Sequence, residues 1–201
     1  FLMIRRPPRS TPKPSSVASD VYKRQPYGSG LAGKTLGIVG FGRIGEAVDE
    51  RVLPLKLKIV NHNRKKKNSP HRYFASLIDL AYNSDILLCI LPGGQDTERV
   101  INAEVLKALG PTGIFINIGR GTSVDKNSLI EFLAHEKIAA AGLDVYAKEP
   151  SIPEALRELD NTVLLPHIGS ATIETRDAMG DLVLKNLEAF FSKNELVPEV
   201  K

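Results

Sequence analysis

The stretch from Leu36 to Gly45 reads Leu-Gly-Ile-Val-Gly-Phe-Gly-Arg-Ile-Gly, and it limits the possible folds more than any other part of the chain. A short apolar run ends in the pattern Gly-x-Gly-x-x-Gly and leads into residues 43–53, which can form a helix. A strand, a tight glycine turn and a helix in this order can hold the pyrophosphate of a dinucleotide. Because similar glycine-rich turns also occur without a ligand, the rest of the chain has to decide between the two interpretations.

Each residue of this turn has an expected role. We expect Gly40 to allow a sharp turn, Gly42 to let the backbone approach phosphate oxygens, and Gly45 to let the helix pack on the strand. Arg43 and Ile44 begin the helix, so their N–H groups and the positive end of the helix dipole would face the anion.

The charge of the chain is unevenly distributed. Residues 1–25 carry six of the 27 lysines and arginines and one of the 23 acidic residues, which leaves 21 bases and 22 acids in the rest of the chain. This balance predicts no basic surface for nucleic acid. Every apolar run is shorter than the roughly 18 residues that span a bilayer, so no membrane partner is predicted. No metal site is predicted either.

The single cysteine, Cys89, lies within the apolar run 86–91. A free cysteine in such a run behaves as a small hydrophobic residue, and we expect it to be buried. One cysteine cannot form an internal disulfide, which fits a reducing compartment and a cytoplasmic location.

Residues 1–25 differ from the rest of the chain. They are rich in proline, serine and arginine, and they have neither apolar periodicity nor the apolar core of a secretory signal. They resemble translated sequencing-adaptor read-through; a disordered targeting arm is the alternative. We therefore predict a dinucleotide-binding domain over residues 26–170, followed by a helix and tail over residues 171–201.

From Leu36 onward, short apolar runs alternate with helical segments. This alternation predicts an α/β fold with a doubly wound, Rossmann-type parallel sheet that is covered on both faces. Strands are expected at 36–40, 57–61, 86–91, 114–118, 138–144 and 162–165. Helices are expected at 43–53, 75–82, 98–108, 125–136 and 172–191, with Asp125 as a helix cap.

Three ionisable residues directly follow predicted strands: Arg120, Glu149 and His167. Open α/β sheets bind ligands at the carboxyl ends of their strands, so we expect these side chains to meet beside the nucleotide. Arg120 offers a planar fork for a carboxylate, and His167 can give a proton to a carbonyl oxygen as hydride reaches its carbon. Glu149 can orient the imidazole and stabilise its charged form. Taken singly, each could instead be an ordinary loop residue.

Four motifs together resemble the D-isomer-specific 2-hydroxyacid dehydrogenases. They are the glycine turn, Asn117-Ile118-Gly119-Arg120-Gly121, the run from Gly142 to Pro150, and Pro166-His167-Ile168-Gly169-Ser170-Ala171-Thr172. The most similar branch is that of hydroxypyruvate, glyoxylate and hydroxyphenylpyruvate reductases. The resemblance implies Arg120 as the carboxylate-binding arginine, Glu149 and His167 as the catalytic pair, and Asp144 beside the nicotinamide. It also implies cofactor contacts at Pro92, Thr97, Ile118, Gly119, Arg120, His167, Gly169 and Ser170.

The sequence departs from the family pattern after the second predicted strand. The acidic residue expected there, which would bind the ribose 2′-hydroxyl, is replaced by Asn63 and followed by Arg64 and Lys65. An acid would repel a 2′-phosphate, whereas Arg64 and the neighbouring lysines would attract it. We therefore predict NADP(H) as the preferred cofactor, with NAD(H) still possible. The alternative is a solvated basic loop.

In this family a substrate domain precedes the nucleotide domain, and the resemblance implies that such a domain is missing from these 201 residues. The resemblance implies that the helix at 172–191 packs on that domain, so we expect its apolar stripe to be exposed and the chain alone to turn over slowly. It also implies a homodimer of the full-length protein, a small 2-oxo acid as the substrate and a D-2-hydroxy acid as the product. Two alternatives stay open, which are a nucleotide-binding regulatory protein similar to co-repressors and an inactive truncated product.

Overall fold

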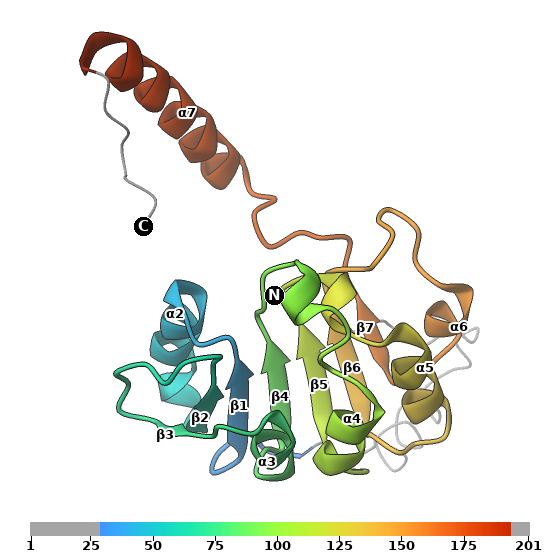
Figure 1. Cartoon of the computed structure of the whole chain (residues 1–201). Coiled ribbons are helices and arrows are strands. Elements are labelled where there is room, and N and C mark those ends of the chain that lie inside the picture. The colour runs from blue at the N-terminus through green and yellow to red at the C-terminus, as the bar shows by residue number, and fades with distance from the viewer. Residues whose placement is uncertain (1–28, 194–201) are drawn as a thin grey trace, which may run out of the picture. The chain divides into compact units, whose positions relative to one another are not determined.

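A computed structural model describes residues 29–193. They divide into two units, one ending at Leu164 and the other starting at Leu165, and each is described by itself. The first unit is built on a seven-stranded sheet in which every pairing is parallel, in the order β3-β2-β1-β4-β5-β6-β7 (Figure 1). The strands are β1 (Thr35–Val39), β2 (Lys58–His62), β3 (Arg72–Tyr73), β4 (Ile86–Cys89), β5 (Ile114–Asn117), β6 (Ala140–Leu143) and β7 (Thr162–Leu164).

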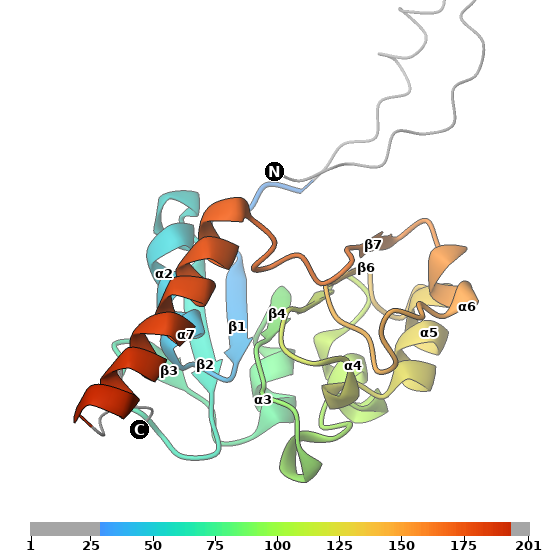
Figure 2. The same ribbon diagram turned by 90° about the horizontal axis from the view of Figure 1, so that it is seen from above.

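Two apolar layers cover this sheet, one on each face. Neighbouring residues of a strand point to opposite faces, so Ile38 belongs to one layer and Val39 to the other. The Ile38 layer packs against α2, whereas the Val39 layer packs against α3, α4 and α5 (Figure 2). This double coverage explains why β4 is buried along its whole length, and it confirms the predicted doubly wound fold.

Helices connect the strands. They are α2 (Arg43–Val52), α3 (Leu77–Tyr82), α4 (Ala103–Leu109), α5 (Lys126–Ala134) and α6 (Glu154–Arg157), with 3-10 turns η1 (Leu53–Leu55), η2 (Gln95–Thr97) and η3 (Gly121–Ser123). The six predicted strands and the helices at 43–53, 75–82 and 125–136 are confirmed within a few residues at their ends. β3 and α6 were not predicted, because two and four residues are too short to show a periodic pattern.

The prediction of a helix over residues 98–108 is wrong at its start. The helix begins at Ala103, because the Asn102 side chain accepts hydrogen bonds from the N–H groups of Glu104 and Val105 at 3.0 and 3.1 Å. The residues before it are held elsewhere, since Ile101 bridges to Val124 in parallel. An asparagine before the apolar residues of this helix was the signal available in the sequence.

The predicted cap at Asp125 is confirmed. Its side chain accepts a hydrogen bond from the Ser128 N–H at 2.8 Å, and this bond is the main reason that the pKa of the carboxyl is lowered. A lowered pKa means that the carboxylate contributes stability above the ordinary pKa of an aspartate. That contribution is lost as the pH falls through the lowered value.

We expect Asp125→Ala to lower the free energy of unfolding by about 1 kcal/mol at pH 7, because the start of α5 loses its cap. The loss should shrink as the pH falls below 4. Urea unfolding at pH 7 and at pH values below 4 measures both effects, with Asp125→Asn as the control that keeps a capping oxygen without the charge. An equal loss for both variants at pH 7 would show that the capping hydrogen bond is not what matters.

The second unit consists of a short connecting segment and α7 (Ile173–Lys193), which confirms the helix predicted at 172–191 (Figure 1). Thr172 caps it, since its Oγ1 accepts from the Thr175 N–H at 3.2 Å. The predicted apolar stripe is exposed, with exposed fractions from 41% at Leu182 to 82% at Phe191.

Candidate active site

The turn after β1 requires glycine at its first position. Gly40 has a φ of +94°, and a Cβ there would lie 3.0 Å from the Ile90 carbonyl oxygen at the end of β4. At Gly45 a Cβ would lie 3.2 Å from Cδ2 of Phe41 and 3.5 Å from the Gly40 carbonyl oxygen. The first turn of α2 therefore packs closely against the glycine turn, and Val48 and Val52 further along α2 pack against the layer that contains Ile38 of β1.

Gly42 borders open space. Among the residues that the structure describes, a Cβ placed there would meet Nζ of Lys67, at 3.8 Å. Gly42 is also the N-cap of α2 and provides no side-chain hydrogen bond to the first turn, which begins with Arg43 and the 59% exposed Ile44. Uncapped N–H groups at the positive end of a ten-residue helix, with a lysine beside them, suit an anion such as a pyrophosphate.

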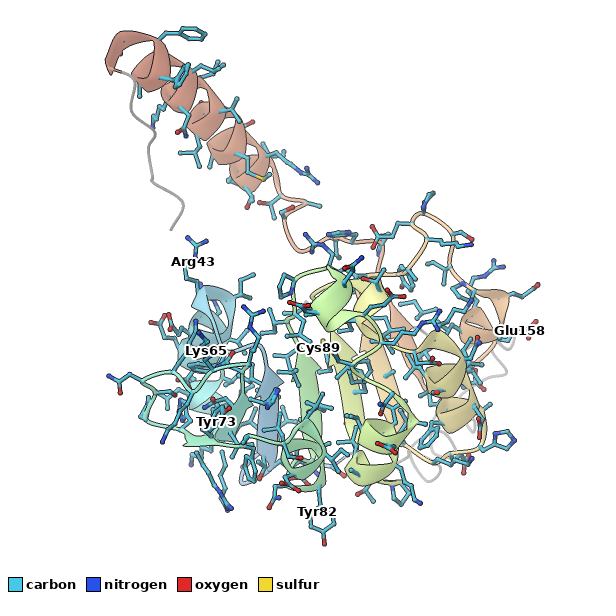
Figure 3. The ribbon with its side chains drawn as sticks, viewed as in Figure 1. Arg43, Lys65, Tyr73, Tyr82, Cys89 and Glu158 are labelled. Carbon is cyan, nitrogen blue, oxygen red and sulfur yellow. The ribbon has the colours of Figure 1, made fainter. Side chains whose placement is uncertain are left out.

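The end of β2 carries the residues that were predicted to distinguish the two cofactors. The Asn63 side chain donates to the Phe41 carbonyl oxygen at 3.4 Å, so it lies against the glycine turn. Arg64 extends to Asp96, with 3.1 Å between Nη1 and Oδ2. Lys65 is exposed, and Figure 3 shows it on the same part of the molecule as Arg43. The lysine nearest to the glycine turn is Lys67, which was only part of the predicted basic run.

The loop after β4 lies between the glycine turn and Arg120. Thr97 Oγ1 donates to the Pro92 carbonyl oxygen at 2.7 Å, which closes this loop on itself. A Cβ at Gly93 would lie 3.4 Å from Cγ of Arg120, so the loops after β4 and β5 are in contact. Pro92, a predicted cofactor contact that Thr97 holds in place, therefore directly precedes the residue that contacts Arg120.

Arg120 is held in place by a buried asparagine that was given no role from the sequence. Asn117 is 1% exposed; its Oδ1 accepts from the Gly119 N–H at 3.0 Å and its Nδ2 donates to the Arg120 carbonyl oxygen at 3.1 Å. Ser123 Oγ donates to the same carbonyl oxygen at 2.6 Å. Gly119 is required as well, because a Cβ there would lie 2.5 Å from the Leu91 carbonyl oxygen. The backbone around the arginine is therefore rigidly defined.

The guanidinium of Arg120 remains near its own loop. Its Nη1 donates to the Gly119 carbonyl oxygen at 2.8 Å, and the residue is exposed. The neighbouring Ile118 is apolar and 37% exposed at the end of β5. An exposed guanidinium can bind a carboxylate through two parallel hydrogen bonds.

The loop after β6 holds the predicted acidic residues. Asp144 is 8% exposed, and its N–H donates to the Asn117 carbonyl oxygen at 3.0 Å, so it adjoins the arginine loop. Oε1 of Glu149 accepts from the Tyr146 N–H at 3.0 Å, which orients the carboxylate from within its own loop. Tyr146 in turn lies directly against Gly121. Arg120, Asp144 and Glu149 thus share one edge of the sheet with the glycine turn.

His167, Gly169 and Ser170 belong to the second unit, so the convergence of His167 with Arg120 and Glu149 stays a prediction. The backbone of His167 has a φ of +55°, in the left-handed region that few residues other than glycine adopt. Such a conformation costs about 1–3 kcal/mol and is concentrated at functional sites. Lys56, Arg99 and Glu136 adopt the same conformation, so it does not by itself distinguish His167.

Two further features are absent from residues 29–193. No group of three metal-binding side chains occurs there. None of the helices in this range combines the length and the apolar character needed to cross a membrane.

Known proteins share both the sequence and the structure of this chain. Residues 9–169 match the family described as D-isomer specific 2-hydroxyacid dehydrogenase, NAD binding domain. The match begins inside the segment 1–25, whose origin stays a prediction and which lies outside the described residues. A hydroxyphenylpyruvate reductase from Plectranthus scutellarioides is 49% identical over 171 residues, which are 85% of this chain and 55% of that protein.

A glyoxylate/hydroxypyruvate reductase from Arabidopsis thaliana is 45% identical and covers 85% of this chain and 55% of that protein. Among solved structures, the NADPH-dependent glyoxylate/hydroxypyruvate reductase from Sinorhizobium meliloti, in complex with NADP and malonate, has a TM-score of 0.84 at 40% identity. It covers 92% of this chain and 59% of that one. The chain spans about half the length of the curated relatives it matches. On these grounds it belongs to the D-isomer specific 2-hydroxyacid dehydrogenase family, whose NAD-binding domain it contains.

Proposed function

We propose that this chain binds NADP(H) and serves a reductase that converts a small 2-oxo acid, such as hydroxypyruvate or glyoxylate, into the D-2-hydroxy acid. The observation that carries the proposal is the meeting of two features at one sheet edge. An open, uncapped helix start at Gly42 suits the pyrophosphate, and an exposed arginine, Arg120, is held at the adjoining loop. The names of the relatives agree with both the cofactor and the substrate class.

The preference for NADP(H) over NAD(H) rests on the end of β2. Asn63 stands where an acid would bind a ribose 2′-hydroxyl, and it carries no charge to repel a phosphate. Arg64, Lys65 and Lys67 bring positive charge to the same region, and Lys67 lies beside Gly42. A planar guanidinium at Arg64 suits a phosphate better than a hydroxyl.

When bound, NADPH supplies the hydride. Arg120 would hold the substrate carboxylate through its guanidinium, which fixes the 2-oxo group in one orientation. His167 would give a proton to the carbonyl oxygen, and Glu149 would keep the imidazole oriented and stabilise its charged form. The hydrogen bond from Tyr146 to Glu149 supports this role, because it holds the carboxylate in a defined position.

Arg64→Ala is expected to weaken NADPH binding by about tenfold or more, because a charge-assisted hydrogen bond to the 2′-phosphate is lost. NADH affinity should change by less than about twofold, since that phosphate is absent. The chain has no tryptophan whose quenching could report binding, so the fluorescence of NADPH itself is followed. Calorimetry gives the dissociation constants of both nucleotides.

Arg157→Ala, an equal change in charge on α6, provides the matched control and should leave both affinities unchanged. Equal losses for NADPH and NADH in Arg64→Ala would contradict the assignment of Arg64. Failure of the unaltered chain to bind either nucleotide would contradict the proposed function as a whole.

We also propose that the protein acts in the cytoplasm and that the full-length form is a homodimer. The first proposal is supported by Cys89, a free thiol that is fully buried and whose pKa is raised by that burial. Such a thiol is unreactive and is typical of proteins kept in a reducing environment. The second rests on the family resemblance.

A further inference from the structure

The ion pair between Arg64 and Asp96 joins the loop after β2 to the loop after β4. In the sheet, β1 lies between these two strands. The glycine turn follows β1, so the ion pair links the loops on either side of this turn. The guanidinium of Arg64 and the carboxylate of Asp96 would therefore both lie near a dinucleotide that binds at the glycine turn.

Neighbouring hydrogen bonds fix both ends of this ion pair. The residue before Arg64 is tied on two sides, because Asn63 donates to Phe41 through its side chain and accepts from Tyr73 Oη through its carbonyl at 3.0 Å. The residue after Asp96, Thr97, donates to carbonyl oxygens of its own loop. Arg64 and Asp96 therefore extend from backbone positions that are well defined, although their side chains are 82% and 80% exposed.

We infer that Asp96 competes with the cofactor's 2′-phosphate for Arg64 and thereby sets the ratio of NADPH to NADH affinity. This inference rests on the proposed function, in which Arg64 binds that phosphate. The end of β2 lacks an acidic residue of its own, and the carboxylate that pairs with Arg64 comes from the loop after β4. A phosphate that binds the guanidinium has to displace the Asp96 carboxylate from it, and the broken ion pair lowers the net gain from binding the phosphate.

The size of the effect follows from the exposure of the pair. Charges in water a few ångströms apart interact weakly, and a phosphate carries more charge than a carboxylate. Removing the carboxylate charge should therefore raise NADPH affinity about two- to fivefold at low ionic strength, and less in high salt. NADH has no 2′-phosphate, so its affinity should stay within about twofold.

Asp96→Asn tests the inference, because it removes the charge and keeps the shape of the side chain. Glu98→Gln is the matched control: it removes a negative charge two residues away that pairs with Arg99 at 3.9 Å and not with Arg64. Dissociation constants for NADPH and NADH are measured by calorimetry at two salt concentrations. Adenosine 2′,5′-bisphosphate and AMP provide the same comparison without the nicotinamide, because they differ only in the 2′-phosphate.

The expected result is tighter binding of NADPH and of adenosine 2′,5′-bisphosphate in Asp96→Asn alone. The gain should disappear in the double variant with Arg64→Ala, because the two side chains act through one another. Equal changes for NADPH and NADH, an equal gain in Glu98→Gln, or a gain that persists without Arg64 would each overturn the inference. If Arg64→Ala weakens NADPH selectively while Asp96→Asn has no effect, the proposed function survives and this inference fails.

Discussion

Replacing His167 by asparagine is expected to slow hydride transfer to a 2-oxo acid by about a hundredfold to ten-thousandfold, the contribution that a positioned general acid makes. Asparagine is the informative substitution because it tolerates the left-handed backbone conformation that His167 adopts, at φ +55°. The variant thus removes the imidazole with little change in backbone strain. Affinity for NADPH should change by less than about threefold.

The rate is measured as single-turnover loss of bound NADPH emission at saturating hydroxypyruvate or glyoxylate. A single-turnover measurement suits a chain that spans about half the length of its relatives, because it detects slow chemistry without requiring rapid cycling. His135→Asn is the control, since His135 follows α5 and bonds only within that helix end. A His167→Asn variant as fast as the unaltered chain would exclude His167 as the proton donor.

Gly121→Ala is expected to destabilise the fold by about 3 kcal/mol or more, or to prevent folding. A Cβ at this position would lie 2.5 Å from Cα of Tyr146 and would overlap the following backbone atoms as well. Backbone cannot rotate away as a side chain can, so the loops after β5 and β6 would have to separate. These are the loops that carry Arg120 and Glu149, and NADPH binding should weaken along with stability.

Urea unfolding measures the loss, and Gly142→Ala provides the comparison. Gly142 lies in β6, and a Cβ there would meet only side-chain atoms of Ile116 at 3.8 Å or more, an ordinary contact. We expect that variant to remain within about 1 kcal/mol of the unaltered chain. Similar stability for the two variants would show that the loops after β5 and β6 are not packed as closely as the structure indicates.

The elements that could be predicted are those with a local signal. The continuous apolar runs of β1 and β4 and the helical spacing of the apolar residues in α7 are visible directly in the sequence. The left-handed conformation at Gly40 is likewise a property of its own residue, and it was predicted as a sharp turn. By contrast, β3 has two residues and α6 has four, which is too short for any period to be visible.

Parts of the candidate site could not be predicted, because their signal is not local. Asn117 looks like the polar end of a strand, and only the fold shows that its amide bonds to both Gly119 and Arg120. Lys67 is one of three adjacent lysines, and nothing in the sequence distinguishes the one that lies beside Gly42. Such contacts depend on how a loop closes, which residue types alone do not determine.

The sequence by itself determined the alternation of strands and helices, the glycine turn, and the types of side chain that follow each strand. Each of these depends only on residues that are neighbours in the chain. The tertiary structure decided which of those groups meet. The parallel order β2-β1-β4 brings Arg64 and Asp96, 32 positions apart, to opposite sides of one turn. Strand order arises from the packing of the whole sheet, since each strand must bury both faces against helices that are far away in the chain.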